Sequence, residues 1–585
     1  MEKNRLKAYK NLSDPLPETY YKWPLFGEGF GNLGVDGKPV ETKMPEIKPN
    51  ELLLRIDALG LCFSDVKVIN LGNKHSRIFG RDMAAEPVVL GHETSVTVIK
   101  VGDERKNGFK PGQRYVIQPD VYYKGIPVTF GYCIEGALQQ YVVVGDEVID
   151  GDEGCYLMKI KDTDGYAETA LLEPWSCVEA AYGITFRNSM KNDGIAWIAG
   201  TDNARSDQYD IDGLFDIGNH PKKIVTTNIK GKFYEMLYKL SGVIGFDLED
   251  AAGSGTPLEL SEKYTTGNGF DDIIVLGTPS PEFVEDSSRV LANGGIYAFV
   301  SDVPIDRKVS IDVGRIHYDG IYYTGTKSVK IANAYNQNKI RDIRAGGKIW
   351  LAGAGGPLGQ MHTQRAVGMP GGPVTIIATD IDTQRINELK SRFTGSASAR
   401  GALFSSYNTK EIDIAAFENL LYEKCGAGKL DDVIILAPVP QLIEQGADWL
   451  GENGVMNIFA GITKGSYVKL EISNCYMKNQ RWVGNSGTSI AYMLDVLKKT
   501  QNKKLFPNHS VAAIGGLNAA YQGLEAVKSS AFAGKVVIFP QMPDMPLIAI
   551  NKLHKDFPNV AKKLEDDRFW SKEAEDELIK SQWRK

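Results

Sequence analysis

Three residues in two short stretches have side chains that could bind a metal ion. Cys62 lies in Leu59-Gly-Leu-Cys-Phe-Ser-Asp-Val66, and His92 and Glu93 follow about thirty residues later in Gly91-His-Glu93. A thiolate, an imidazole and a carboxylate are donor types that suit zinc. Three protein ligands with an open fourth position are typical of a catalytic zinc, not a structural one. The spacing therefore predicts a catalytic zinc site.

Two side chains beside the cysteine could serve this metal. Zinc lowers the pKa of a bound alcohol, so that an alkoxide forms near neutral pH and can release a hydride. Ser64 could start a proton relay to solvent, although a turn serine is an equally good interpretation of it in isolation. Asp65 could accept the ring N–H of His92 and fix its tautomer, or it could be an ordinary loop aspartate.

Glu173 is a further candidate for the metal. It precedes Pro174 at the start of residues 170–181, a segment that predicts a helix with the proline in its first turn. Glu173 could bind the metal directly or through a water molecule, or it could simply complement the helix dipole. The sequence leaves open whether Glu93 or Glu173 contacts the zinc directly.

A glycine-rich stretch far along the chain could bind a dinucleotide. A strand-like run, residues 348–352, is followed by Gly353-Ala-Gly-Gly-Pro-Leu-Gly359 and by a segment that can form a helix. In this context, backbone N–H groups and the helix N-terminus hold a pyrophosphate. The glycine spacing is imperfect, because one glycine falls a residue late. The candidate cofactor-binding residues are Gly353, Gly355, Gly356, Leu358 and Gly359.

Asp380 ends the next predicted strand and could bind the ribose 2′-OH of the cofactor. An acidic residue at this point favours NAD over NADP. The gap between the glycines and Asp380 is longer than usual, which fits the additional turn Met369-Pro-Gly-Gly372.

Short β-branched or alternating runs surround the metal candidates and predict a β-rich domain. The predicted strands are residues 51–58, 94–101, 136–144 and 534–539, and residues 110–117 predict a turn followed by a strand. Cys62 and His92 are expected on loops between strands, where functional residues usually lie. Residues 516–528 predict an amphipathic helix, and residues 541–585 predict a charged helical tail.

Strand-like runs alternate with helical segments from about residue 193, which is typical of a parallel α/β sheet. The pattern occurs twice, in the same order and at offsets of about 152 to 160 residues: 194–200 with 347–353, 224–230 with 376–382, 270–276 with 430–436, and 293–299 with 453–459. We therefore expect an internal duplication of one Rossmann-type doubly wound domain, at about 190–345 and 346–500.

The first copy lacks the features that predict nucleotide binding in the second. No clustered glycines follow Gly200, and Asn228 stands where the second copy has Asp380. Without those glycines the backbone cannot approach a phosphate closely. We expect a degenerate domain that keeps the fold, has lost the cofactor and serves a structural or subunit-interface role.

Length and composition limit the class of protein. At 585 residues the chain is too long for a single hydrophobic core, and its length predicts about three domains. The 67 basic and 73 acidic residues give a net charge of −6, which offers no case for binding nucleic acid or a membrane. No apolar run suggests a membrane span or a signal peptide, so a cytoplasmic location is expected. The six scattered cysteines form no C-x-x-C pair, which argues against disulfides and a four-cysteine zinc lobe.

The motifs together resemble those of zinc-dependent medium-chain alcohol and polyol dehydrogenases. The matching motifs are Gly60-x-Cys62-x-Ser64-Asp65, Gly91-His92-Glu93, Lys110-Pro-Gly-x-Arg114, Leu172-Glu-Pro174, and Leu524-Glu-Ala-Val-Lys528 with Gly534-Lys-Val-Val-Ile538. Residues 356–366, 378–382 and 485–489 resemble the L-sorbose-1-phosphate reductase-like branch.

The resemblance implies a GroES-like catalytic zinc domain at 1–189, completed by 501–540, and an NAD-binding Rossmann domain at 346–500. It also implies one catalytic zinc on Cys62, His92 and a glutamate, and a homo-oligomer, either a dimer or a tetramer. Three departures stand out: Cys133 alone remains where relatives carry four cysteines, Lys67 lies where many carry a relay histidine, and residues 190–345 are additional.

The expected activity is reversible hydride transfer between NAD(H) and a secondary alcohol of a polyol, sugar or sugar phosphate. One alternative is a zinc-independent quinone-type reductase of the same fold, which Cys62, His92 and Glu93 argue against. Another is a non-catalytic NAD-binding or assembly protein, whose function would depend mainly on the duplicated domain. We expect the second copy to face the zinc, because it has both the glycines and the acid.

Overall fold

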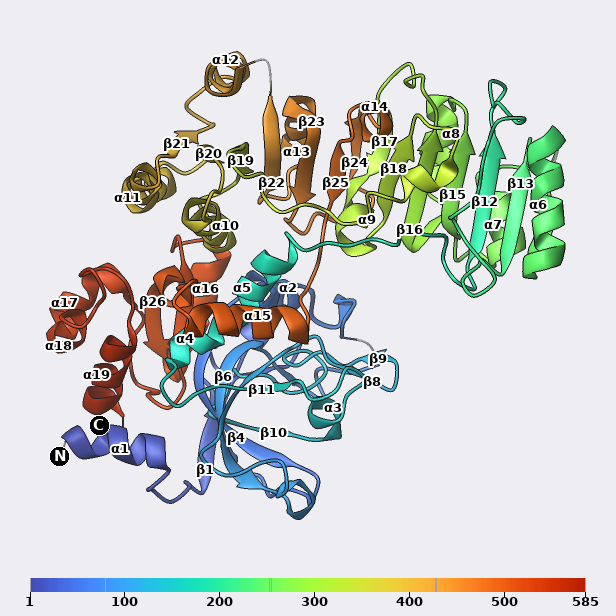
Figure 1. The fold of residues 1–585 in the computed structure, drawn as a ribbon. Helices are drawn as coiled ribbons and strands as arrows, with labels where there is room; N and C mark the ends of the chain where they lie inside the picture. Colours follow the sequence, from blue (N-terminus) through green and yellow to red (C-terminus); the bar gives the residue numbers. More distant parts are fainter. Residues whose placement is uncertain (1, 79, 252, 254, 427–428, 584–585) are drawn as a thin grey trace. The chain divides into compact units, whose positions relative to one another are not determined.

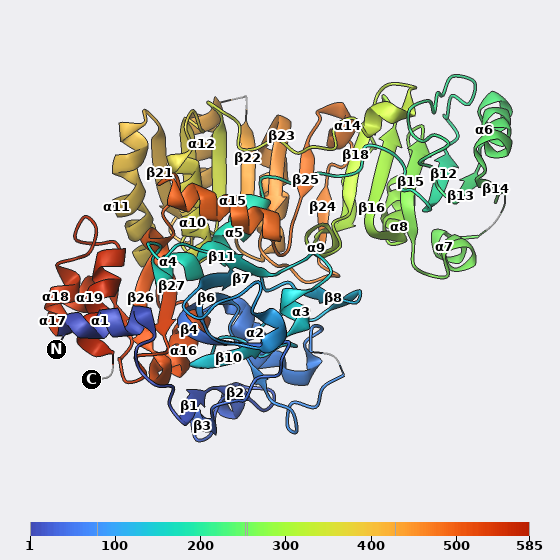
Figure 2. The same cartoon turned by 60° about the horizontal axis from the view of Figure 1, so that its bottom comes forward.

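The computed structural model describes residues 2–78, 80–251, 253, 255–426 and 429–583. The chain forms two compact units: Met1–Glu179 with Gly356–Met361 and Gly487–Lys585, and Ala180–Gly355 with His362–Ser486. Figures 1 and 2 label their helices and strands in two views. In the part of the chain that the structure describes, no helix is long and apolar enough to cross a membrane.

The first unit is built on a mainly antiparallel eight-stranded sheet. Its order is β11-β7-β6-β4-β27-β26-β28, and β10 also pairs with β4. The strands are β4 (Leu52–Gly60), β6 (Glu93–Val101), β7 (Arg114–Ile117), β10 (Tyr141–Val144), β11 (Leu157–Lys159), β26 (Val511–Gly516), β27 (Lys535–Phe539) and β28 (Ile548–Ala549). Since β27 pairs directly with β4, residues near the C-terminus complete a sheet that begins near residue 52.

Helices and a buried core hold this sheet. The main helices are α1 (Glu2–Asn11), α2 (Phe63–Leu71), α4 (Tyr166–Ala170), α5 (Leu172–Ala180), α15 (Ile490–Gln501), α16 (Ala520–Lys528), α17 (Leu553–Asp556), α18 (Pro558–Ala561) and α19 (Lys572–Gln582). Trp23 is fully buried in the core, and its indole N–H donates to the Leu517 carbonyl over 2.8 Å. The core therefore also joins sequence-distant parts of the chain.

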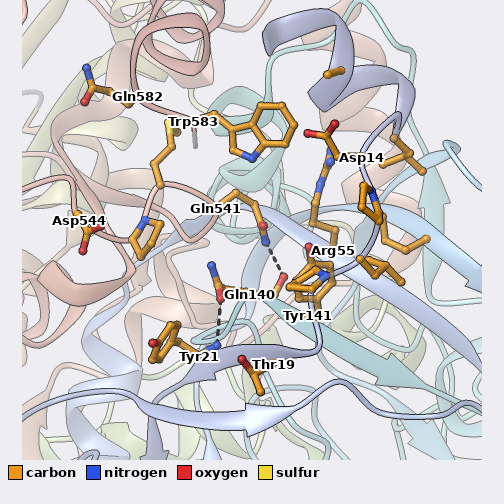
Figure 3. Close-up of a pocket in the computed structure, with 18 of the residues that line it drawn as sticks. Asp14, Thr19, Tyr21, Arg55, Gln140, Tyr141, Gln541, Asp544, Gln582 and Trp583 are labelled. Carbon is orange, nitrogen blue, oxygen red and sulfur yellow. Dashed lines mark hydrogen bonds between the residues drawn. The ribbon is translucent and has the colours of Figure 1, made fainter. Parts of the chain in front are cut away.

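The two ends of the chain meet in the first unit and line a cavity of about 840 Å³ (Figure 3). Lys10 of α1 forms an ion pair of 2.8 Å with Asp576 of α19, and the Tyr9 ring lies 5.2 Å from the Trp583 ring. Arg55 also lines this cavity but is bound to Asp57 at 2.8 Å. The N-terminal helix and the C-terminal tail thus stabilise each other.

The second unit contains two parallel six-stranded sheets with the same order. The first sheet, β14-β13-β12-β15-β16-β18, and the second, β21-β20-β19-β22-β23-β25, both follow the doubly wound pattern. The strands are β12 (Ile195–Gly200), β13 (Lys223–Thr227), β14 (Asp247–Asp250), β15 (Phe270–Leu276), β16 (Leu291–Val300) and β18 (Tyr322–Thr326), then β19 (Lys348–Ala352), β20 (Thr375–Asp380), β21 (Leu403–Asn408), β22 (Leu430–Ile435), β23 (Leu450–Ile458) and β25 (Arg481–Val483). The predicted pair of Rossmann-type domains is confirmed.

The two copies also share individual hydrogen bonds. The indole N–H of Trp197 donates to Thr227 Oγ1 over 2.9 Å, and that of Trp350 donates to Thr379 Oγ1 over 2.9 Å. These residues lie in the first and second strands of each copy, so the copies agree in side-chain detail.

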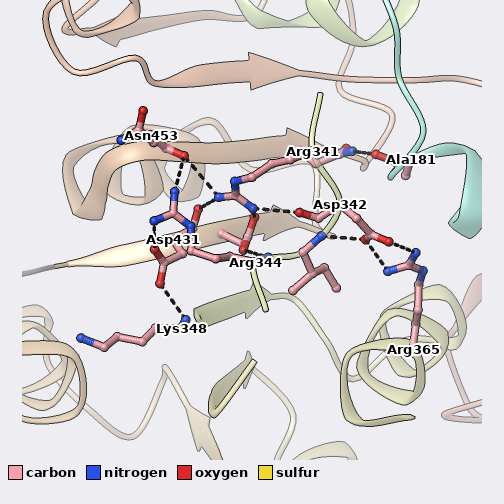
Figure 4. A network of polar contacts seen from close by, with 11 residues as sticks. Ala181, Arg341, Asp342, Arg344, Lys348, Arg365, Asp431 and Asn453 are labelled. Carbon is pink, nitrogen blue, oxygen red and sulfur yellow. Dashed lines mark hydrogen bonds and ion pairs between the residues drawn. The ribbon is translucent and has the colours of Figure 1, made fainter. Parts of the chain in front are cut away.

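An arginine–aspartate pair recurs in the same way. In the first copy Arg187 donates to Asp272 over 3.1 Å. In the second copy Arg341 donates to Asp432 over 2.7 Å, next to the contacts of Arg344 and Lys348 with Asp431 shown in Figure 4. The repeated pairs argue for one ancestral domain.

The copies differ where a nucleotide would bind. In the second copy a glycine turn and α10 (Pro357–Gly368) follow β19. In the first copy residues 201–222, which follow β12, form turns and no helix. A helix N-terminus after the first strand is what holds a pyrophosphate in this fold. The first copy is therefore degenerate, as its missing glycines indicated.

His362 of α10 predicts an acid-sensitive second unit. The side chain is buried, and Nδ1 lies 2.6 Å from the Tyr182 hydroxyl. Burial, aided by the charge of Arg365, lowers the pKa of His362 to about 3. The unfolded chain therefore binds more protons between about pH 6.5 and 3, so stability is full above this window and falls as the pH falls through it.

We expect the unfolding free energy to fall by about 2 kcal/mol between pH 7 and pH 5 because of this one group. The change should be absent in His362→Phe and retained in the control His554→Gln, whose side chain is exposed. Urea unfolding at the two pH values measures it. An equal loss in wild type and His362→Phe would show that His362 already titrates normally in the folded chain.

Candidate active site

Cys62 is held at the junction of β4 and α2. It is the N-cap residue of α2, with extended backbone, and its N–H donates to the Asp65 carboxylate over 3.0 Å. Cys62 thus lies in a loop, as predicted, but the loop leads from β4 into a helix and not into a second strand. The sequence did not predict this helix because polar Asp65 and apolar Val66 are both buried, so its nine residues show little amphipathic pattern.

His92 and Glu93 enter the site at the start of β6. Gly91, with φ of 97°, provides a left-handed turn that other residues rarely adopt, and places His92 just before the strand. Glu93 pairs with Gly60 across the β4–β6 ladder. A side chain at Gly60 would collide with the Glu93 carboxylate, so this glycine makes room for it.

The structure brings three predicted metal-binding side chains together. Ligand atoms of Cys62, His92 and Glu93 all lie within 4.8 Å of one another. His92 and Glu93 are buried and Cys62 is partly exposed. The residues come from adjacent strand ends of one sheet, and their thiolate, imidazole and carboxylate donors match the ligand set of a zinc ion.

Asp65 and Ser64 contact these side chains directly. Asp65 Oδ1 lies 3.2 Å from His92 Nδ1, which leaves Nε2 as the nitrogen that faces the cluster. The Ser64 hydroxyl donates to Cys62 Sγ over 3.0 Å and lies 3.2 Å from His92 Nε2. Burial alone would lower the pKa of His92, but the negative charge of Asp65, the nearby Tyr132 and the hydrogen bonds to Asp65 and Cys62 together outweigh it, and the pKa is raised well above its usual value.

Glu173 lies near the cluster but outside the group of three. It is buried in the first turn of α5, as predicted, and the Cys177 thiol donates to its Oε1 over 3.5 Å. Burial raises the pKa of Glu173 to about 7, with the charge of His92 acting in the opposite direction and Glu93 adding to the rise.

Lys535 is a residue of the site that the sequence did not reveal. It is the first residue of β27, is almost fully buried, and forms an ion pair with Glu93 Oε1. Among the described residues, Glu93 Oε2 has no hydrogen-bond partner. One carboxylate oxygen is thus held by a cation, and the other is buried beside Gly60. This buried, unpaired oxygen is the atom that a metal ion would satisfy.

We expect Lys535→Met to destabilise the metal-free protein. Losing one member of a buried ion pair leaves an uncompensated charge and costs about 3–5 kcal/mol. Calorimetry should show a lower unfolding midpoint for Lys535→Met, a smaller change for Lys535→Arg, and none for Lys562→Met, whose side chain is exposed. A midpoint equal to that of the wild type would mean that the ion pair does not form.

The glycine turn of the second copy has the geometry of a dinucleotide loop. Gly353 has φ of 86°, and the Gly355 N–H donates to Asp380 Oδ2 over 2.8 Å. A Cβ added at Gly355 would lie 2.7 Å from the same oxygen, whereas one at Gly356 would meet nothing within 4 Å. The turn therefore requires glycine at 355 and leaves open space beside 356.

The remaining predicted cofactor residues adjoin this turn. Leu358 and Gly359 lie in the first turn of α10. Asp380, at the end of β20, is buried and also accepts the Ile381 N–H over 2.8 Å. Its carboxylate thus lies against the glycine backbone, where a ribose hydroxyl would be recognised.

Parts of the chain are similar in sequence to known proteins. Residues 48–150 match the family model described as the alcohol dehydrogenase GroES-like domain. This range contains the whole metal cluster. The first unit thus contains an alcohol dehydrogenase GroES-like domain. The resemblance to the medium-chain alcohol dehydrogenase superfamily is thereby confirmed.

Three curated relatives extend the match beyond the GroES-like domain. Mannitol-1-phosphate 5-dehydrogenase of Aliivibrio fischeri (strain ATCC 700601 / ES114) is 24% identical over 536 residues, which cover 90% of this chain and 88% of the relative. L-sorbose 1-phosphate reductase of Klebsiella pneumoniae is 29% identical over 301 residues, or 48% of this chain and 70% of the relative. Sorbitol dehydrogenase of Homo sapiens is 42% identical over 165 residues, or 26% of this chain and 42% of the relative.

Proposed function

We propose that this protein is a zinc-dependent oxidoreductase that transfers a hydride between NAD(H) and a secondary alcohol or ketone. The observation that carries the proposal is the buried cluster of Cys62, His92 and Glu93 in the GroES-like domain. The three relatives are named for polyols or sugar phosphates, which supports this substrate class. We infer a polyol, sugar or sugar phosphate as substrate.

Cys62, His92 and Glu93 would hold the metal, and Glu173 would contact it through water. When bound, zinc supplies Lewis-acid polarisation of the substrate oxygen. Asp65 accepts a hydrogen bond from His92 Nδ1 and so presents Nε2 to the metal. Lys535 holds one oxygen of Glu93 and thereby fixes the direction of the other.

Ser64 is the group of this chain best placed to move the proton of the alcohol. Its hydroxyl lies between Cys62 Sγ and His92 Nε2, at 3.0 and 3.2 Å, and is partly exposed. A hydroxyl can accept a proton while donating its own to the next group, which makes it a suitable first member of a relay. Lys67 on the next turn of α2 is partly exposed and replaces the histidine expected further along such a relay.

The second copy would bind NAD through Gly353, Gly355, Gly356, Leu358, Gly359 and Asp380. The backbone N–H groups and the start of α10 suit a pyrophosphate. The Asp380 carboxylate suits a free ribose 2′-OH and would repel a 2′-phosphate, which favours NAD over NADP.

A turnover assay with a panel of polyols and sugar phosphates tests the proposal. We expect NAD reduction with at least one secondary alcohol and one zinc per chain by elemental analysis. Zinc-free protein with full turnover would indicate the quinone-type reductase. NAD binding without turnover on any substrate would indicate the non-catalytic assembly protein.

A further inference from the structure

The two Rossmann copies are joined by a strand pairing that belongs to neither sheet. β17 (Val309–Asp312) of the first copy pairs antiparallel with β24 (Tyr467–Leu470) of the second. Figure 1 shows these two strands side by side. The buried residues oppose each other, with Val309 facing Leu470.

This pairing has the symmetry of a dimer. Aligning the copies at an offset of about 159 residues makes Val309 equivalent to Val468, and Ile311 equivalent to Leu470. The pair Val309–Leu470 then becomes Val468–Ile311, which is the other buried pair of the ladder. In a two-fold dimer each contact occurs twice, with the roles of the two subunits exchanged. Such a contact is called isologous, and the strand pairing between the two copies has this form.

Two glycines at equivalent positions of the two copies show the same symmetry. A Cβ added at Gly325 of β18 would lie 3.0 Å from Tyr476 Cβ in the second copy. A Cβ added at the equivalent Gly484 would lie 2.8 Å from His317 Cα in the first copy, and His317 is the equivalent of Tyr476. Each copy thus uses a glycine to admit a helix of the other. Such close packing at two symmetric positions is a feature of a specific interface.

The contact between the two copies, called the joint below, also contains a continuous hydrophobic core. One cluster of buried side chains includes Val309 and Ile311 of the first copy with Val468, Leu470 and Trp482 of the second. The Tyr476 hydroxyl donates across the joint to the Val303 carbonyl over 2.9 Å. Burial of this kind resembles an obligate interface, not a contact between domains that move independently.

We propose that the first copy is a permanently attached dimer partner of the second. The first copy has lost the glycine turn and the helix that follow its first strand, yet it has kept every symmetric contact described above. Its retained role is to cover, within one chain, the face that a second copy of a single Rossmann domain would cover. A homo-oligomer of this protein must then form through another surface.

Ser310 and Lys469 provide the test, because they are direct partners in the ladder and lie where the local symmetry axis passes. Opposed antiparallel residues have Cα atoms about 4.5–5.5 Å apart, within the range of a disulfide. The double variant Ser310→Cys/Lys469→Cys of the full chain is oxidised and run on a denaturing gel without reductant, and the linked peptides are identified by mass spectrometry. Each single variant is the matched control.

We expect an internal disulfide in a chain of monomer mass, and none in either single variant. A covalent dimer linked through residues 310 and 469 would overturn the proposal, because the two strands would then come from different chains. Failure of the double variant to form this disulfide would overturn it as well, because the strands would not be paired in solution.

Discussion

Replacing Cys62 with alanine is expected to remove the zinc and to lower turnover at least about a thousandfold, since Lewis-acid stabilisation is worth several kcal/mol. The thiolate is the softest of the three donors in the cluster. His92 and Glu93 alone leave too few ligands for tight binding. Elemental analysis of zinc and a steady-state turnover assay measure the two effects together.

The matched control is Cys155→Ala. Cys155 is exposed and belongs to the same unit, but it is not a member of the metal cluster. Zinc content and turnover should equal those of the wild type. Full turnover in Cys62→Ala would exclude the proposed metal site, whereas equal losses in both variants would point to general damage to the fold.

Replacing Gly355 with valine is expected to weaken NAD binding about a hundredfold, because the fingerprint glycine allows the pyrophosphate to approach the backbone closely. The added Cβ would lie 2.7 Å from Asp380 Oδ2 and 2.8 Å from Arg385 Cβ. The turn would have to open and would lose its hydrogen bond to Asp380. Calorimetric titration with NAD gives the dissociation constant directly.

The duplication supplies a matched control for this variant. Asp202 occupies the equivalent position in the first copy, after β12, and its side chain is exposed. Asp202→Val should leave NAD affinity unchanged. Loss of affinity in Asp202→Val with none in Gly355→Val would assign the nucleotide to the first copy.

The sequence predicted most of the sheet architecture because strand signals are local. β4 is an alternating run, β6 is rich in β-branched residues and β27 is apolar after Lys535, and the two Rossmann copies repeat strand-like runs in the same order. Three metal-type residues were recognisable because they lie in two short motifs at the ends of neighbouring strands. The family resemblance added the GroES-like domain, which the comparison confirmed.

Other features depend on contacts that no local pattern encodes. Lys535 lies 442 residues from Glu93, and the two are brought together because β27 and β6 both pair with β4. The joint between the copies rests on two four-residue strands, β17 and β24, which are too short to give a periodic signal. Long-range strand pairing and burial, and not residue type, determine both the position of Lys535 and the contact between the two copies.

Restoring zinc to metal-free protein is the sharpest test of whether hydride transfer depends on the metal. The chain is treated with a chelator, zinc is added in steps, and NADH formation from a polyol or sugar phosphate that the panel has shown to be a substrate is followed at each step. We expect turnover to be lost with the metal and to return in proportion to added zinc, up to one ion per chain. Full turnover in the metal-free protein would contradict it.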